Sequence, residues 1–320
     1  MNSRRGKFCF LAGLAVAVST PVLARDSSTR STVAIPDFSG MWMHPWLPGY
    51  EPLASGPTSL KNRSRRYGVP DGPGNNVIGE GVSNPLQLVG DYTNPILRPE
   101  AAATVKKFGE MSVDHYGFPN PRNQCWPNGL PFVLSSNGLQ MFQHPDSITM
   151  IYQTDHQFRH VRMNQAHPPH VTPSWYGDSV GHYEGDVLVI DTVAIKPGPF
   201  AMVDWFGTPQ TPALHVIERY RLLDYEAAKE GLERASRENA LPLPPAVDLN
   251  HRGKYLQLLF TVDDPTVFTT PWSATVTFGP PAPLAENRVS PWLEQVCGEN
   301  PKKYGTERDV RLPTADRADF

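Results

Sequence analysis

The chain has few cysteines and lacks any apolar run long enough to span a bilayer, although it contains 320 residues. The apolar run Phe8–Val18 follows a basic segment at Arg4–Lys7 and precedes the small-residue sequence Val22–Ala24. This order predicts that residues 1–24 are a signal peptide. We therefore expect a mature protein that is periplasmic or secreted, with no membrane insertion.

Only three cysteines occur, and the predicted signal peptide contains one of them, Cys9. Its removal leaves Cys125 and Cys297. In an oxidising compartment such a pair is more simply a disulfide than a catalytic thiol, and it would tie the middle of the chain to its C-terminal part. Two free buried thiols are the alternative.

Positive charge is not in excess, since the chain has 29 basic and 32 acidic residues. Without the three basic residues of the predicted signal peptide, 26 basic residues remain and the net charge is near −6. This balance argues against nucleic acid as a partner. The motifs Gly-x-Gly-x-x-Gly, Gly-x-x-x-x-Gly-Lys-Ser and Gly-x-Ser-x-Gly are also missing, so nucleotide binding and the common serine-hydrolase elbow are unsupported. We expect a small-molecule partner and no cofactor.

Proline and aromatic residues, in contrast, are abundant. The 34 prolines are roughly twice the usual share, and they favour loops and sheet edges because proline cannot donate to a strand ladder. Seven Trp, fourteen Phe and eleven Tyr residues exclude a disordered chain. About 300 mature residues are enough for one large domain or two smaller ones.

Short alternating runs separated by turn residues predict a mainly β protein. A first strand is expected within Ile35–Trp42, and the other expected strands are Pro131–Leu134, Leu139–Gln143, Ile148–Gln153, Gln157–Met163, Val180–Tyr183, Val187–Ala194, Leu214–Leu222, Tyr255–Val262 and Ala274–Phe278. Helices are expected at 99–111 and 224–239, with a final turn at 292–297. We predict a single antiparallel β-barrel (lipocalin-like) or a sandwich, with long Pro-rich loops and two or three short helices.

The expected domain covers residues 35–300. A disordered segment at 25–34 precedes it, and a tail at 301–320 follows. Residues 45–96 are rich in Pro and Gly and show little periodicity, so they form a long loop excursion that is a candidate lid.

One core-facing row carries a charge. Glu218 shares its strand face with Val216 and Tyr220, and burying an unpaired carboxylate costs several kcal/mol. Arg159, on the core-facing row of another strand, is its natural partner. The pair is either a buried ion pair that fixes strand register, or a carboxylate and a guanidinium that line a ligand cavity.

Other candidate catalytic residues are His167, His215 and Asp191. The histidines are possible general acids or bases, or else surface or hydrogen-bonded structural residues. Asp191 ends the β-branched run of the hairpin formed by Trp175–Thr192, on the strand face opposite Thr192.

Three aromatic residues are candidates for binding a planar ligand: Trp175, Tyr176 and Trp205. Ordinary core packing is the alternative for each. Metal binding is not expected, because His156 and His160 would be about 13 Å apart on a strand. A metal site assembled from distant strands stays open.

Several motifs together resemble a large family of exported bacterial proteins of mostly unassigned function. They run from about residue 36 to 300 and comprise Asp37–Trp42, Cys125–Pro131, Asp155–Arg159 with His167-Pro168, Trp175–Thr192, Leu214–Arg219, Asp264-Pro265 with Pro271-Trp272, and Val296–Asn300. Two departures stand out. Tyr183 replaces a usual Trp, and Asn164–Ala166 replaces a usual Asp-Gly-Arg, so family roles in that loop do not carry over.

The resemblance implies a role in the breakdown of lignin-derived aromatic dimers, including cofactor-free decarboxylation of phenylpropenoic acids. Our main hypothesis is therefore a carboxy-lyase. In it Arg159 orients the substrate carboxylate, and Glu218, Asp191 or His215 handles the phenol proton. His167 or Tyr176 protonates the alkene carbon. A lipocalin-like carrier for an apolar aromatic or lipid is the alternative, as is a hydrolase or isomerase on the same scaffold.

Overall fold

The computed structural model describes the chain in seven segments, which are residues 34–45, 49–63, 88–115, 118–135, 138–155, 157–238 and 247–283. Several predictions fall outside these residues. They are the signal peptide at 1–24, nearly all of the 25–34 segment, most of the 45–96 excursion, the final turn at 292–297 and the 301–320 tail. The described residues from Ala34 onward belong to one compact unit.

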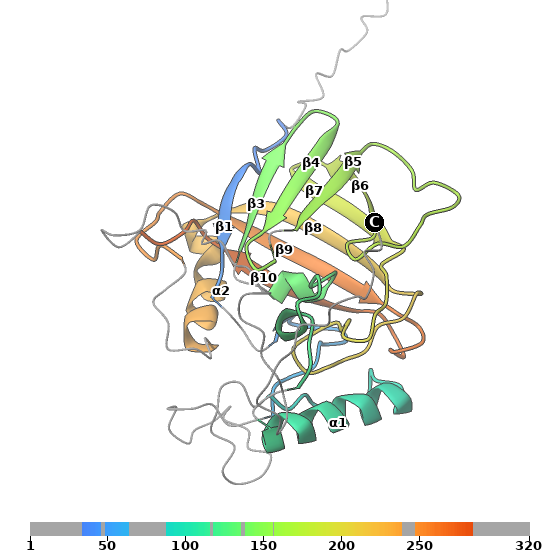
Figure 1. Ribbon diagram of the computed structural model, residues 1–320. Helices are drawn as coiled ribbons and strands as arrows, with labels where there is room; N and C mark the ends of the chain where they lie inside the picture. The colour runs from blue at the N-terminus through green and yellow to red at the C-terminus, as the bar shows by residue number, and fades with distance from the viewer. Residues whose placement is uncertain are drawn as a thin grey trace, which may run out of the picture. The chain divides into compact units, whose positions relative to one another are not determined.

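Ten strands form one curled sheet in the order β1-β3-β4-β5-β6-β7-β8-β9-β10-β2 (Figure 1). Their bounds are β1 Gly40–Met43, β2 Glu51–Pro52, β3 Gly138–Gln143, β4 Ser147–Tyr152, β5 Phe158–Met163, β6 Asp178–Glu184, β7 Val187–Val193, β8 His215–Asp224, β9 Lys254–Asp263 and β10 Trp272–Phe278. The protein is thus mainly β with a barrel-like fold, as the sequence predicts.

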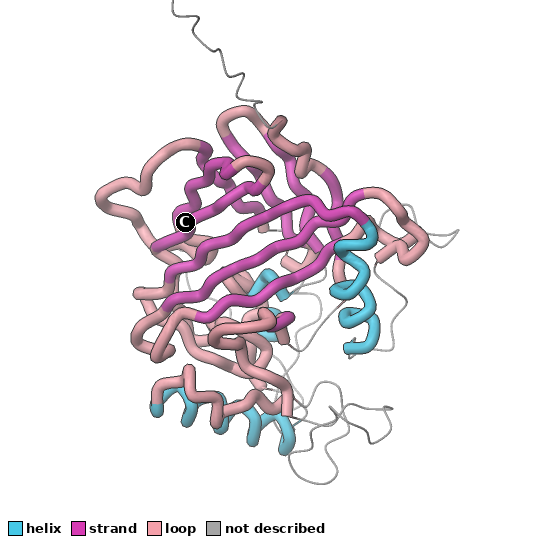
Figure 2. The backbone as a smooth tube through the Cα atoms, turned by 180° about the vertical axis from the view of Figure 1, so that it is seen from behind, coloured by secondary structure: helices cyan, strands magenta, loops and turns pink. Residues whose placement is uncertain are grey.

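The sheet curls until its first strand returns to its last long strand. The backbone N–H of Met43 donates to the carbonyl of Gly279 at 2.7 Å, and the N–H of Gly279 donates back at 2.8 Å. Figure 2 shows the long strands β8 to β10 running side by side. A sheet that curls this far encloses its inner face and leaves little exposed edge.

One pair of neighbours differs from the predicted antiparallel arrangement. Strands β5 and β6 are parallel, with Val161 opposite Ser179. A parallel pair needs a long crossover connection, and residues 164–177 supply it. Pro168, Pro169 and Pro173 favour the extended course of this connection.

The predicted helices and most predicted strands match the observed elements closely, but one predicted strand is wrong and the short strand β2 is not among the predictions. Pro131–Leu134 is not a strand, because Phe132–Ser135 forms a 3₁₀ helix in which all four residues are buried. A short apolar run buried on every side has no periodicity that separates a strand from a helical turn. A second 3₁₀ helix covers Arg122–Gln124.

Alternation along the strands decides which side chains enter the core. The inner face of β7 and β8 carries fully or almost fully buried residues, namely Leu188, Ile190, Thr192, Val216, Glu218 and Tyr220. Large aromatic residues, including Trp272, Tyr152 and Phe260, share this enclosed space. Burial of each large apolar side chain contributes roughly 1.5–3 kcal/mol, so this core is the main source of stability.

The two α-helices cover different parts of the unit (Figure 1). Helix α1, Pro99–His115, buries Ala101 and Val105 in the main core. Helix α2, Tyr225–Glu238, packs against β8, β9 and β10 and buries Ala228 and Leu232 in a smaller core. Neither helix has the length and apolar character needed to cross a membrane.

Candidate functional site

The sheet separates the five candidate catalytic residues into two groups. Arg159 on β5 and Glu218 on β8 point to the inner face and are 2% and 0% exposed. Asp191 on β7 is next to the inward-facing Thr192, and His215 on β8 is next to the inward-facing Val216. Because successive residues of a strand point to opposite faces, Asp191 and His215 belong to the outer face. His167 comes from the 164–177 connection, and its contacts place it with the outer group.

Inside the barrel, Arg159 is bound on several sides by the protein. Its Nε donates to Ser179 Oγ at 2.9 Å and its Nη1 to Tyr152 OH at 3.3 Å. Its Nη2 donates to Thr192 Oγ1 at 2.6 Å and to Glu218 Oε2 at 2.5 Å. The predicted ion pair between Arg159 and Glu218 is therefore confirmed.

Glu218 is equally engaged. Its second oxygen, Oε1, accepts a hydrogen bond of 2.7 Å from Tyr220 OH. Burial is the largest single effect on the pKa of Arg159 and disfavours its charged form, but the Glu218 carboxylate, together with Tyr152 and Tyr220, more than offsets burial, so the pKa of Arg159 is raised. Burial also raises the pKa of Tyr152 to about 12 and that of Tyr220 well above its ordinary value. The groups of this network thus satisfy one another, which is how a structural ion pair is stabilised in a core.

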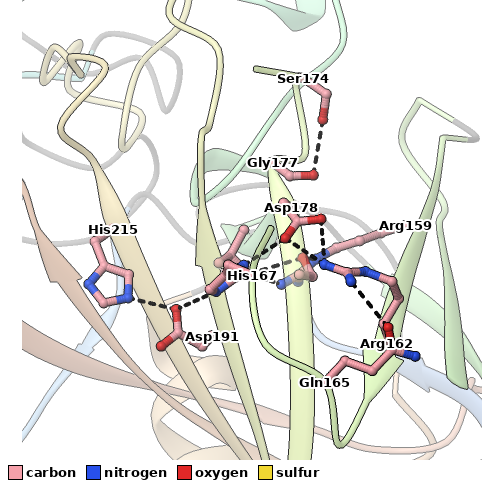
Figure 3. A network of polar contacts seen from close by, with 11 residues as sticks. Arg159, Arg162, Gln165, His167, Ser174, Gly177, Asp178, Asp191 and His215 are labelled. Carbon is pink, nitrogen blue, oxygen red and sulfur yellow. Dashed lines mark hydrogen bonds and ion pairs between the residues drawn. The ribbon is translucent and has the colours of Figure 1, made fainter. Parts of the chain in front are cut away.

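On the outer face, five side chains form a chain in which basic side chains and carboxylates alternate (Figure 3). Arg162 Nη2 donates to both oxygens of Asp178, at 2.8 and 2.7 Å. His167 Nδ1 lies 2.6 Å from Asp178 Oδ2, and its Nε2 lies 3.3 Å from Asp191 Oδ1. His215 Nε2 lies 2.7 Å from the same Asp191 oxygen. We call these five residues the outer cluster.

The two histidines of the outer cluster differ in what their rings can do. Both nitrogens of His167 face carboxylates, so both contacts are hydrogen bonds only when both nitrogens carry a proton. His215 needs only one proton, on Nε2, to donate to Asp191. Its Nδ1 has no hydrogen-bond partner among the described residues and is then free to accept a proton.

Exposure also distinguishes the outer cluster from the interior network. The side chains of Asp191 and His215 are 39% and 36% exposed, whereas those of Arg159 and Glu218 are 1% and 0% exposed. A dissolved small molecule can reach the first pair without unfolding of the sheet. His167 is 23% exposed and, through Asp178 and Asp191, joins the crossover connection to strands β6 and β7.

The predicted ligand-binding aromatics do not share one surface. Trp205 is buried, packs on Phe132 at 4.8 Å and donates from Nε1 to Ser135 Oγ at 2.8 Å. Tyr176 is also buried, and its OH donates to Asp155 Oδ2 at 2.6 Å. Trp175 alone of the three is half-buried.

Taken together, the candidates expected to act in one cavity lie at separate places. Arg159, Glu218 and Trp205 belong to the core, and His167, Asp191 and His215 belong to the outer cluster. Asp191 and Glu218 were both expected to handle the phenol proton in one cavity. The structure places these two residues on opposite faces of the sheet.

The sequence interpretation missed Arg162 and Asp178. The signal was present, because alternation with Arg159 and Val161 places Arg162 on the outer face of its strand. What the sequence could not supply was the parallel pairing of β5 with β6, which sets Arg162 opposite Val180 and thus near Asp178.

Within the part of the chain that the structure describes, no group of three or more His, Cys, Asp or Glu residues is arranged to hold a metal ion. Cys297 lies outside the described residues, so its pairing with Cys125 stays a prediction. No known family model matches the chain, and searches of curated proteins and of solved structures find no significant match.

Proposed function

We propose that the protein is a cofactor-independent enzyme that works by acid–base chemistry at the outer cluster, with His215 as the catalytic residue. The observation that carries this proposal is the contact of His215 Nε2 with Asp191 at 2.7 Å on an accessible face of the sheet. A carboxylate that holds one ring nitrogen orients the imidazole and leaves the other nitrogen for proton transfer.

Asp191 and His167 are positioning residues in this proposal. Asp191 fixes the ring orientation of His215 and stabilises the imidazolium that forms when His215 takes up a proton. His167 contacts the same Asp191 oxygen and thereby holds that carboxylate from the other side. Arg159 and Glu218 take a structural role, since their charged groups are bound by the core.

The reaction class that we propose is decarboxylation of a phenylpropenoic acid. His215 removes the phenol proton, and a proton delivered to the alkene carbon next to the carboxylate gives a quinone methide. The bond to the carboxylate then breaks, CO2 leaves, and its electron pair restores the aromatic ring as a vinylphenolate, which takes back the proton held by His215. The net reaction consumes one proton and needs no oxidant or reductant.

A direct test is incubation of the purified protein with ferulate, 4-coumarate and a lignin-derived dimer acid, followed by detection of CO2 and the vinyl product. We expect turnover by the native protein and a loss of about 100-fold or more in His215→Gln, the usual contribution of a general acid or base. His182→Gln is the matched control, because His182 also lies on the outer face and contacts Glu184 at 3.1 Å. Failure of the folded native protein to convert any of these acids rejects the proposal, as does full activity of His215→Gln.

A periplasmic carrier for an aromatic ligand is the second candidate. The half-buried Trp175, which packs at right angles on Trp126, favours it. A carrier binds the acids without converting them, and His215→Gln then leaves their affinity unchanged. Export to the periplasm and the family resemblance are part of both proposals.

A further inference from the structure

Three half-buried aromatic residues gather beside the crossover connection. Trp126 and Trp175 pack edge to face with ring centres 5.0 Å apart, and Phe200 packs on Trp126 at 5.9 Å. They come from three segments far apart in the sequence. Rings that are held together yet remain partly accessible form a surface on which another planar ring can pack. We call these three residues the aromatic corner.

A cation lies at this corner. Lys196 Nζ is 4.9 Å from the centre of the Trp175 ring, and the Lys196 side chain is exposed. Its backbone N–H donates to the Ser174 carbonyl at 2.7 Å, which fixes its position next to Trp175. No carboxylate pairs with Lys196 in the described segments. The ammonium group is therefore available to an anion.

The backbone at Gly198 lies close to the indole ring of Trp175. A Cβ atom placed on Gly198 would lie 2.9 Å from the ring atoms of Trp175, closer than real Cβ contacts. Glycine at this position thus lets the backbone approach the Trp175 ring closely. Lys196 and Phe200 flank Gly198 in the sequence.

A buried side-chain amide two residues along the chain from Trp126 has no hydrogen-bond partner among the described residues. Asn128 is 3% exposed, and neither its Nδ2 nor its Oδ1 has a hydrogen-bond partner within the structure. The segment that carries it runs along Trp175, because the N–H of Leu130 donates to the Trp175 carbonyl at 3.4 Å. An unpaired buried amide costs roughly 1–3 kcal/mol, so a polar group that reaches it is stabilised.

We infer that the aromatic corner is a binding subsite for an aromatic carboxylic acid. The ring of the ligand packs on Trp126 and Trp175, its carboxylate pairs with Lys196, and a hydroxyl or methoxy group on the ring bonds to Asn128. This inference rests on the proposed function for its choice of substrate class, and it names the residues that select that class.

The test measures equilibrium binding of ferulate by calorimetry, with two matched probes. Methyl ferulate keeps the ring and lacks the charge, whereas crotonate keeps the unsaturated acid and lacks the ring. Lys196→Met is expected to weaken ferulate binding about tenfold and to leave methyl ferulate unchanged. Lys229→Met, which removes an exposed lysine from α2, is the control and has no effect on either ligand.

Asn128→Leu gives an independent measurement. It removes the unpaired amide, so it raises the melting temperature while it weakens ferulate binding. A purely structural asparagine would show the opposite change in stability. Equal ferulate affinity in the native protein, Lys196→Met and Asn128→Leu overturns the inference, and so does crotonate binding as tight as that of ferulate.

The subsite and the enzyme can fail separately. Ferulate binding that depends on Lys196 without any turnover supports the subsite and rejects the enzyme. If turnover is lost in His215→Gln but Lys196→Met binds ferulate as tightly as the native protein, the result supports the enzyme and overturns the subsite.

Discussion

Removal of one charge from the interior ion pair is expected to destabilise the protein severely. Glu218→Gln leaves the guanidinium of Arg159 without its counter-ion at a position that is 2% exposed. Breaking a buried pair by removing one partner costs about 3–5 kcal/mol. The cost exceeds that of a lost hydrogen bond because the remaining charge stays out of water.

The magnitude can be read as a shift in melting temperature. At about 2–4 °C per kcal/mol for a domain of this size class, Glu218→Gln lowers the melting temperature by roughly 6–20 °C. The matched control is Asp224→Asn, which breaks a 2.7 Å pair with Lys254 at side-chain exposures of 79% and 58%. An exposed pair contributes at most about 1 kcal/mol, so the control shifts by only a few degrees.

The assay is differential scanning calorimetry of both variants and of the double variant Arg159→Met/Glu218→Gln. The double variant removes both charges and recovers part of the lost stability, although the hydroxyls of Ser179 and Thr192 still lose their bonds to Arg159. A melting temperature for Glu218→Gln equal to that of Asp224→Asn refutes the reasoning, since it would mean that the pair is solvated.

Three further outcomes are expected. Burial raises the pKa of Asp204 from 3.8 to about 6, so between those pH values the folded state keeps a proton that the unfolded state has lost. The free energy of unfolding therefore falls as pH rises through this window, by up to roughly 3 kcal/mol. Asp204→Asn removes this pH dependence. Urea unfolding at four pH values checks it, and the same pH dependence of the unfolding free energy in both proteins contradicts the prediction. Non-reducing peptide mapping of exported protein finds Cys125 linked to Cys297, and free thiols at both positions oppose it. Gly198→Ala displaces the Trp175 ring and weakens ferulate binding severalfold, and unchanged calorimetric affinity argues against the close contact.

The sequence predicts the strands well because their faces differ in polarity. The run Gln157–Met163 alternates, and the structure buries Arg159, Val161 and Met163 as that alternation requires. The same alternation places Glu218 in the core, and the cost of an unpaired buried charge identifies Arg159 as its partner. These inferences succeed because burial and charge leave few alternatives.

The site was harder to predict because it depends on how distant segments meet. His167 lies in an irregular connection, and nothing in its sequence sets its distance to Asp178 or Asp191. The parallel pairing of β5 and β6 brings Arg162 to the same place, although pairing partners are not encoded in the periodicity of either strand. Lys196 and Trp126 were missed for the same reason, since their contact with Trp175 joins three separate loops.

The most direct test of the outer cluster is the turnover number of Asp191→Asn on the phenylpropenoic acids. Asp191 contacts both His167 and His215, and it is 39% exposed, so its replacement leaves the fold and the melting temperature nearly unchanged. We predict that the turnover number falls about 100-fold or more while ferulate affinity is kept. A variant that folds normally and converts the acid at the native rate would contradict the assignment of this cluster as the catalytic site.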